Sequence, residues 1–150
     1  VQIFGTDISK KMLQKAKEKS NALSKKTIRL FKMDAAQLDF PDNYFDKAMG
    51  AYILSATDKP KDILFEISRV LKPMGLFVFV NHFKSDTPLM KAVEWWLKPI
   101  SKERGFFTSL DLKEIIKDTS LHILKVEPVN LFGAWHVIVA VNGKKYNNKD

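Results

Sequence analysis

The stretch from residue 60 to residue 83 decides the fold, and it reads PKDILFEISRVLKPMGLFVFVNHF. Pro60 suits the first turn of a helix, and apolar residues then recur at helical spacing up to Leu71. The turn Lys72-Pro73-Met74-Gly75 ends that helix, and Leu76 to Phe83 forms a short apolar run. Such a run is typical of a parallel strand that is buried on both faces. This stretch therefore predicts a helix followed by a strand that is buried on both faces.

Strand and helix signals also alternate before this stretch. Strands are expected at Val1–Gly5, Thr27–Met33 and Phe45–Leu54, and Ser9 is expected to cap a helix after the first of them. Alternation of this kind predicts an α/β domain with a mostly parallel sheet.

The chain after residue 83 predicts two helices and a closing pair of strands. The helices are expected at about residues 87–100 and from a cap at Ser109 to about Asp118, and the strands at Leu121–Val129 and Ala134–Val141. The connection between these strands is too short for parallel pairing, so the last strand is expected to run antiparallel. The length predicts one domain over residues 1–150.

Composition excludes several classes of protein. With 45% apolar residues and no cysteine, the chain is neither largely disordered nor built on disulfides or zinc thiolates. The three histidines show no metal-ligand spacing, so no metal is expected. No apolar run is long enough to cross a membrane and no signal peptide is visible, which favours a cytoplasmic location. The formal charge of +8 indicates an anionic partner, either a membrane surface or nucleic acid.

Four polar or aromatic positions fall at the ends of the expected strands. They are Asp7, Asp34, Tyr52 and the pair Asn81-His82. Parallel sheets bind ligands at the carboxyl ends of their strands. Asp7 suits the two hydroxyls of a ribose but equally suits a helix cap, and Asp34 suits an adenine amine but equally suits a turn. Position alone leaves both alternatives open at each residue.

Four motifs together resemble the class I S-adenosylmethionine-dependent methyltransferases. They cover roughly residues 1–83 and stand in that family's order. They are Gly5-Thr6-Asp7-Ile8-Ser9-x-x-Met12-Leu13-x-x-Ala16, the two successive motifs of Asp34-Ala35-Ala36-x-Leu38-x-Phe40-Pro41-Asp42-Asn43-x-Phe45-Asp46, and Glu66-x-x-Arg69-Val70-Leu71-Lys72-Pro73-x-Gly75.

The resemblance implies a Rossmann-like three-layer sandwich that binds S-adenosyl-L-methionine. Asp7 would hold the ribose hydroxyls, and Asp34 would bind the adenine amine. The other implied cofactor contacts are Ile8 and Met12 on the adenine ring, Ala35 beside it, and Ala51 and Tyr52 near the methionine part.

Two departures from the family pattern carry expectations of their own. The family's central first strand and glycine-rich turn would precede Val1, so the domain is expected to be N-terminally truncated, with a gap in its sheet. This segment alone is therefore expected to lack activity. Met74 stands where the family has glycine, and the turn is expected to adjust to it.

A second resemblance covers the C-terminal half. Val80-Asn81-His82-Phe83, the basic amphipathic stretch that follows and residues 130–135 are similar to the bacterial phosphatidylethanolamine N-methyltransferases. This implies methyl transfer to the amine of a phospholipid head group by a cytoplasmic enzyme that associates peripherally with the membrane. His82 and Tyr52 are the catalytic candidates, and the implied substrate contacts are Asn81, His82, Lys84, Trp95 and Arg104.

Other functions stay open at this point. A C-methyltransferase of quinone biosynthesis shares the first four motifs and takes a membrane-borne substrate. An NAD-dependent oxidoreductase fits Asp7 but not the closing strand pair. A truncated, inactive domain that binds membranes is the non-enzymatic alternative. Nucleic-acid binding is disfavoured, because three of the 25 basic residues are arginine and no recognition motif is present.

Overall fold

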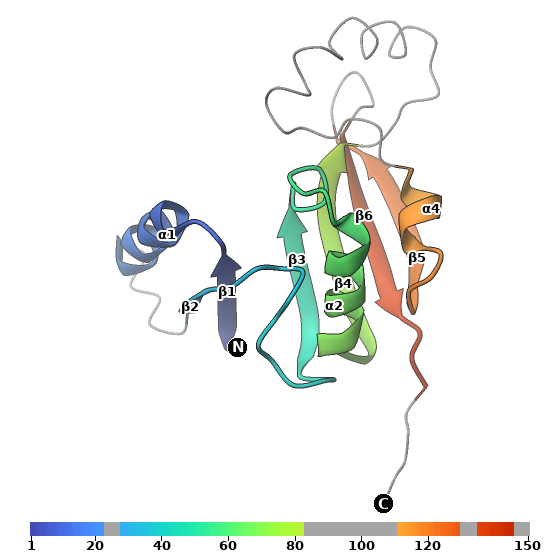
Figure 1. The fold of residues 1–150 in the computed structure, drawn as a ribbon, viewed down its shortest axis with the longest axis horizontal. Helices are drawn as coiled ribbons and strands as arrows, with labels where there is room; N and C mark the ends of the chain where they lie inside the picture. Colours follow the sequence, from blue (N-terminus) through green and yellow to red (C-terminus); the bar gives the residue numbers. More distant parts are fainter. Residues whose placement is uncertain (23–27, 83–110, 130–134, 146–150) are drawn as a thin grey trace, which may run out of the picture.

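The computed structural model describes residues 1–22, 28–82, 111–129 and 135–145 (Figure 1). The elements are arranged in two hydrogen-bonded sheets with helices beside them. In chain order they are β1 (Ile3–Asp7), α1 (Lys10–Ala22), β2 (Ile28–Lys32), β3 (Phe45–Ala51), α2 (Pro60–Val70), β4 (Leu71–His82), α4 (Leu112–Ile116), β5 (Leu121–Pro128) and β6 (Trp135–Asn142).

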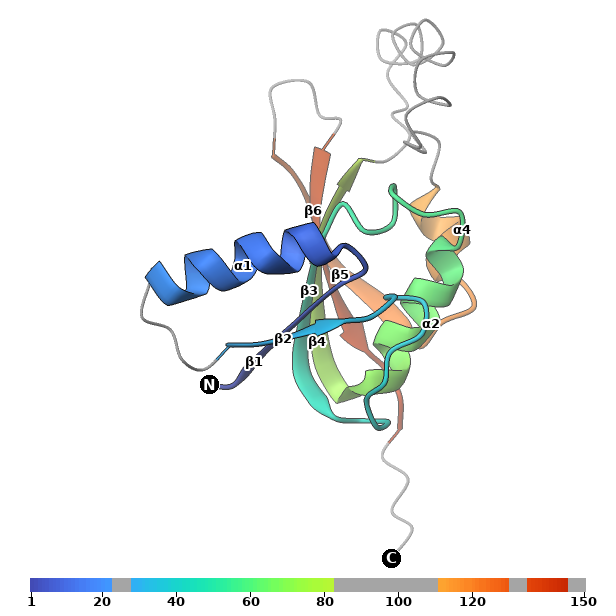
Figure 2. The ribbon, with the colours of Figure 1, turned by 60° about the vertical axis from the view of Figure 1, so that its left-hand side comes forward.

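The strands pair largely as expected from the sequence. β1 pairs with β2 in parallel, and the second sheet has the order β3-β4-β6-β5. β3 and β4 are parallel, whereas β6 runs antiparallel to both of its neighbours. Helices α1 and α2 lie on opposite sides of the strands (Figure 2). The predicted α/β class, with mostly parallel strands and an antiparallel last strand, is confirmed.

The sheet is interrupted between β1 and β3. Among the described strands, β1 hydrogen-bonds to β2 and β3 to β4, so no strand joins the two sheets. This is the gap that the sequence predicted. A cluster of five aromatic rings spans the gap between the two sheets. The centroid of the Phe4 ring lies 5.4 Å from that of Phe45 and 6.1 Å from that of Phe31. Each such ring pair contributes about 0.5–1.5 kcal/mol beyond its buried area, which helps to hold the sheets together.

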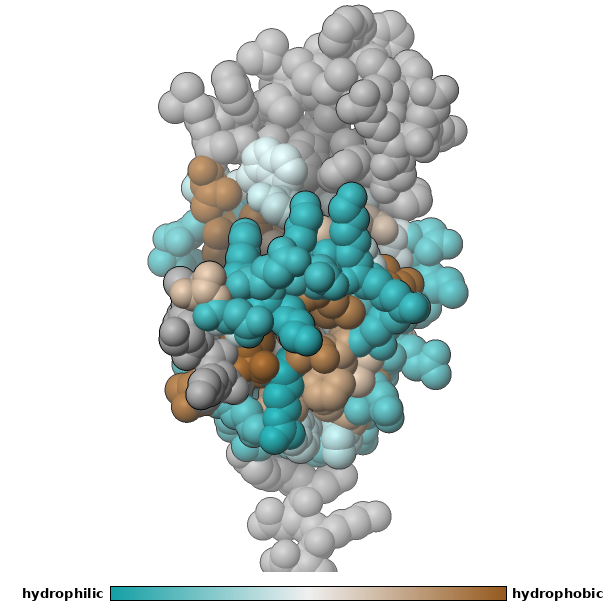
Figure 3. Space-filling model, turned by 90° about the vertical axis from the view of Figure 1, so that its left-hand side faces the viewer, coloured by the Kyte–Doolittle hydropathy of each residue, from teal (hydrophilic) through white to brown (hydrophobic). Residues whose placement is uncertain are grey.

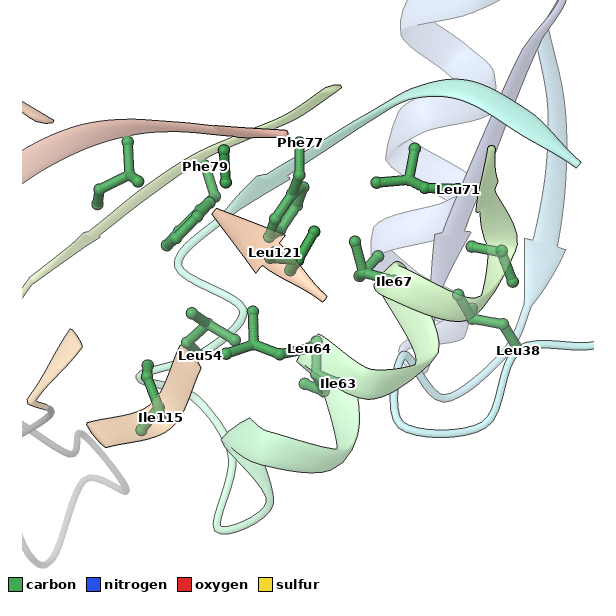
Figure 4. Packing of buried hydrophobic residues seen from close by; sticks show 13 residues of the cluster. Leu38, Leu54, Ile63, Leu64, Ile67, Leu71, Phe77, Phe79, Ile115 and Leu121 are labelled. Carbon is green, nitrogen blue, oxygen red and sulfur yellow. The ribbon is translucent and has the colours of Figure 1, made fainter. Parts of the chain in front are cut away.

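The hydrophobic core lies between α2 and the second sheet (Figure 4). The helix starts at Pro60, and its apolar residues follow the spacing that places them on one face. That face buries Ile63, Leu64, Ile67 and Val70 against the strands. On β4 and β6, the fully buried hydrophobic residues of the core are Leu71, Phe77, Phe79, Ile138 and Ala140.

β4 is covered more on one face than on the other, which differs from the expectation of two buried faces. Phe77 and Phe79 are buried, while the alternate residues Leu76 and Val78 are half-buried. Met49 pairs in register with Val78 and is 88% exposed. The difference arises because, in the described part of the chain, α2 packs on β4 from the side of the two phenylalanines.

Three local predictions were wrong. β3 ends at Ala51, not Leu54, because Tyr52 adopts a positive φ of 61° that leaves the strand. α4 begins at Leu112, and its cap is Asp111, whose carboxylate accepts from two backbone N–H groups of the first turn. The turn at Met74 does not adjust, because Met74 keeps a φ of 61°. The predicted helix at residues 87–100 and the predicted cap Ser109 lie outside the described residues.

Candidate functional site

The carboxyl ends of the parallel strands meet along one edge of the molecule, which is the upper edge in Figure 1. Asp7 is the last residue of β1, and Asp34 follows β2 by two residues. Tyr52 follows β3 directly, and His82 is the last residue of β4. The structure therefore brings the predicted strand-end residues to the edge where parallel sheets bind ligands.

Asp7 and Asp34 have the same hydrogen-bond geometry. Asp7 Oδ1 accepts from Ser9 N at 2.7 Å, and Asp34 Oδ1 accepts from Ala36 N at 2.9 Å. For each carboxylate, no bond from the described residues reaches Oδ2. One oxygen thus fixes the turn, and the second remains able to accept from a ligand. The turn role and the binding role, which the sequence left as alternatives, are compatible at both residues.

Apolar side chains are exposed beside the Asp7 carboxylate. Ile8 is 65% exposed and Met12 is 51% exposed, although both are large and apolar. Ala35, next to Asp34, is half-buried against the core, and its small side chain leaves space beside that turn. An edge that combines a carboxylate acceptor with exposed apolar groups suits a ligand with hydroxyl groups and a flat apolar ring.

Glu66 and Arg69 of α2 hold the loop that follows Asp34, a role that the sequence analysis missed. Leu38 N donates to Glu66 Oε2 at 2.7 Å, and Arg69 Nη2 donates to Leu38 O at 2.8 Å. Arg69 Nη1 also donates to Phe40 O and to Asp42 Oδ1. The hydrogen bond from Arg69 lowers the pKa of Glu66, against a smaller opposing effect of burial. In the sequence, the Glu-x-x-Arg spacing places both side chains on one helix face, and this was the signal that could have indicated the ion pair.

Tyr52 occupies a strained backbone position at the edge. Its φ of 61° lies in the left-handed region, which costs a residue other than glycine about 1–2 kcal/mol. Tyr52 N donates to Val80 O at 2.8 Å, and the Tyr52 ring meets the Trp135 ring edge-on at 5.0 Å. The preceding residue, Ala51, is exposed and pairs with Val80. Strain of this kind is frequent at functional sites.

Asn81 is fully buried and supports the turn that carries Tyr52. Its Oδ1 accepts from Ser55 N at 3.3 Å, and Ser55 Oγ donates to Tyr52 O at 3.3 Å. His82 pairs in register with Trp135, which places both at the same edge as Tyr52. The other predicted substrate contacts lie outside the described residues; they are Lys84, Trp95 and Arg104.

The described part of the chain offers neither a metal site nor a membrane-spanning helix. No group of three or more His, Cys, Asp or Glu side chains is arranged to hold a metal ion there. No helix among the described residues combines the length and apolar character needed to cross a bilayer.

Comparison with known proteins agrees with this geometry. Residues 1–79, just over half of the chain, match the family model of the methyltransferase domain. The chain is 30% identical over 131 residues to a phosphatidylethanolamine N-methyltransferase of Cereibacter sphaeroides, covering 87% of this chain and 64% of that protein. It is 33% identical over 114 residues to a demethylmenaquinone methyltransferase of Lactococcus lactis, covering 75% of this chain and 45% of that protein.

The fold is also that of solved methyltransferases. A SAM-dependent methyltransferase from Methanosarcina mazei superposes with a TM-score of 0.70 at 22% identity, covering 94% of this chain and 82% of that one. The chain spans less than two thirds of the length of the curated relatives named above. Its match to the family model, its identity to these relatives and its fold show that the chain belongs to the methyltransferase domain family.

Proposed function

We propose that the protein transfers a methyl group from S-adenosyl-L-methionine. The observation that carries the proposal is the pair of carboxylates at the strand ends. Asp7 and Asp34 each commit Oδ1 to their own turn, and in each the Oδ2 atom receives no bond from a described residue. Family membership supports the same cofactor.

The residues present fit the adenosine part of this cofactor. The Asp7 carboxylate is a suitable acceptor for ribose hydroxyls, and the Asp34 carboxylate for the exocyclic amine of adenine. Ile8 and Met12 offer exposed apolar surface for the adenine ring, and Ala35 leaves room for it. When bound, S-adenosyl-L-methionine supplies an electrophilic methyl group on a sulfonium. The protein's task is to orient the acceptor towards that methyl and to exclude water, which is worth about 7–11 kcal/mol in well-aligned reactions.

For the acceptor, we infer the amine of a phospholipid head group. The relative from Cereibacter sphaeroides, which carries phosphatidylethanolamine in its name, aligns along 87% of this chain. An amine must be neutral when it attacks, and His82 and Tyr52 lie at the edge where a general base is needed. In this proposal Asn81 acts through Ser55 on the turn that carries Tyr52, while Lys84, Trp95 and Arg104 contact the lipid. The protein then works in the cytoplasm at a membrane surface.

A quinone precursor is the second candidate acceptor. Demethylmenaquinone methyltransferases from several bacteria match 51–75% of this chain at 33–35% identity. These matches cover less of the chain than the phosphatidylethanolamine N-methyltransferase does. Transfer to a ring carbon needs the acceptor activated at an adjacent hydroxyl, a step that His82 or Tyr52 would also serve.

Methyl transfer to defined acceptors separates these candidates. The complete gene product is incubated with S-adenosyl-L-methionine labelled in the methyl group, and with vesicles that contain either phosphatidylethanolamine or demethylmenaquinone kept reduced to its quinol, the form that carries the ring hydroxyls. We expect label in the lipid amine and none in the quinone. Label in the quinone alone replaces the phospholipid assignment by the quinone one. If neither acceptor is labelled and calorimetry detects no binding of S-adenosylhomocysteine, the methyl-transfer proposal is wrong.

A further inference from the structure

The positive charge of the chain is concentrated at one end. Residues 1–32 contain nine of the 25 Lys and Arg residues but two of the 17 Asp and Glu residues, and so hold +7 of the formal charge of +8. The remaining 118 residues are close to neutral. A charge this localised forms a field over one surface of the molecule and not over the whole of it.

Helix α1 carries most of this charge on its exposed surface. None of its residues is buried, and its half-buried residues are Leu13, Ala16 and Ser20. Its five lysines are all exposed, and none of them forms an ion pair with a described residue. They are Lys10, Lys11, Lys15, Lys17 and Lys19. Glu18, the one acidic residue of the helix, accepts from Gln14 instead.

The lysines form a continuous outer face. Lys11, Lys15 and Lys19 recur every four residues and therefore lie in one row along the helix. That row points away from the half-buried side of Leu13 and Ala16, which faces β1 and β2. Figure 3 views the molecule from the side of α1 and shows hydrophilic side chains spread across this face. We call the exposed lysines of α1 the α1 lysine face.

We propose that the α1 lysine face binds the anionic surface of a lipid bilayer. Clusters of four to eight basic residues on one helix are attracted to acidic lipids with about 1 kcal/mol for each charge near the surface. Lysine is a point charge on a flexible stem, which suits a diffuse negative surface. Because α1 begins three residues after Asp7, the face adjoins the strand-end edge described above.

Nucleic acid is the less favoured anionic partner. Duplex recognition uses arginine in bidentate contacts, and single strands stack on aromatic side chains. α1 contains neither arginine nor an aromatic residue. Arg69, one of the three arginines in the chain, is engaged with Glu66 and the loop at Leu38. The chemistry of the face therefore fits a bilayer better than a groove or a base stack.

The inference rests on the membrane surface named in the proposed function and assigns its contact to one face of the molecule. Vesicle binding is measured without methyl transfer, so the α1 lysine face and the methyl-transfer proposal can fail independently. The complete gene product is sedimented with vesicles of phosphatidylcholine alone, or of phosphatidylcholine with one third phosphatidylglycerol. We expect binding to the anionic vesicles that is lost between about 0.05 M and about 0.5 M salt, where screening becomes strong. Equal binding to both kinds of vesicle overturns the proposal.

Two matched triple variants test the location. The first removes charge from the α1 lysine face: Lys11→Gln, Lys15→Gln and Lys19→Gln. The second removes the same charge from exposed lysines at α2 and α4: Lys59→Gln, Lys113→Gln and Lys117→Gln. The first is expected to bind anionic vesicles roughly 100-fold more weakly, and the second to stay within about threefold of the unmodified protein.

Three outcomes decide the test. A Lys-to-Arg triple variant at residues 11, 15 and 19 keeps the charge and should bind anionic vesicles as the unmodified protein does. This would show that the Gln triple binds weakly because it lost charge, not because it misfolded. Equal losses in the two Gln triples would mean that net charge alone matters, and the α1 lysine face would not be the site. If duplex DNA or RNA binds more tightly than the anionic vesicles at the same salt, the surface belongs to nucleic acid and the bilayer assignment is wrong.

Discussion

Glu66 and Arg69 lie one turn apart on α2 and form a two-point ion pair. Arg69 Nε donates to Glu66 Oε1 at 2.7 Å, and Arg69 Nη2 donates to Glu66 Oε2 at 2.9 Å. The pair also binds the N–H and the C=O of Leu38, four residues after Asp34 in the loop between β2 and β3. A helix face is thereby tied to the loop that carries one of the two proposed cofactor carboxylates.

Replacing Arg69 by lysine should destabilise the protein by about 2–3 kcal/mol, because one ammonium cannot serve the carbonyls of Leu38 and Phe40 and two carboxylates at once. Chemical denaturation of the Arg69→Lys variant measures the loss. Arg29→Lys is the matched control, because Arg29 is exposed on β2 and its side chain forms no hydrogen bond or ion pair with the described residues. The control should change stability by less than about 0.5 kcal/mol. Equal stability of the two variants would show that the fork geometry of Arg69 contributes nothing.

The stability contributed by Glu66 should depend on pH. The hydrogen bond from Arg69 lowers the pKa of Glu66 below its usual value of 4.5 in the folded state. Its contribution is therefore fully present above the unfolded pKa and is lost as the pH falls through the folded one. At pH 7 the Glu66→Gln variant should be less stable than the wild type by about 2 kcal/mol, and this deficit should shrink as the solution is acidified below pH 4.5.

Denaturation at a series of pH values measures this deficit. The control is Glu114→Gln, since Glu114 is an exposed residue of α4 whose carboxylate has no partner among the described residues. Its deficit should be small at every pH. A Glu66→Gln deficit that stays constant from neutral to acidic pH would mean that the charge of Glu66 does not stabilise the fold.

The order of the elements was predictable because its signals are local. Pro60 marks the start of α2, and the apolar spacing from Ile63 to Val70 matches the face that is buried. Strand ends were predictable for the same reason, so Asp7 and Asp34 could be singled out. The end of β3 was not predictable. It is set by the left-handed backbone of Tyr52, and tyrosine is not a residue type that signals this conformation.

The supports of the site could not be derived from sequence, because they join distant segments. Asn81 is 26 residues from its partner Ser55, and Glu66 is 28 residues from Leu38. In the sequence Asn81 therefore suggested a substrate contact, whereas in the structure its side chain is buried beneath the Tyr52 turn. Which polar residue faces a ligand and which faces the core depends on pairings that no local pattern encodes.

Met74→Gly should stabilise the protein by about 1 kcal/mol, because glycine removes the cost of a left-handed φ. Part of this gain is offset, because glycine raises the conformational entropy of the unfolded chain. Met74 is 68% exposed, so little packing is lost. Met49→Gly is the control, since Met49 is also exposed but lies within β3, where glycine weakens a strand. Thermal melts should shift upward for Met74→Gly and downward for Met49→Gly. A downward shift in both would show that the φ of 61° at Met74 costs nothing.

Asp7→Asn and Asp34→Asn should each weaken binding of S-adenosylhomocysteine by about 10- to 100-fold, the cost of losing a hydrogen bond to a charged acceptor. Asparagine keeps the Oδ1 that accepts from Ser9 N or Ala36 N, so the turns should persist and the melting temperature should hardly change. Calorimetric titration of the complete gene product measures the affinity.

Asp39→Asn supplies the control for both variants, because Asp39 is exposed in the same loop as Asp34 and its carboxylate bonds to no described residue. A general loss of negative charge would weaken binding in all three variants alike, whereas direct contacts at Asp7 and Asp34 leave the Asp39 variant unchanged. If Asp7→Asn binds as tightly as the wild type, Asp7 serves the turn at Ser9 alone. The ribose must then be held elsewhere, because the amide keeps the oxygen of the turn bond but replaces the ligand-facing oxygen, an acceptor, by an NH2 group that only donates.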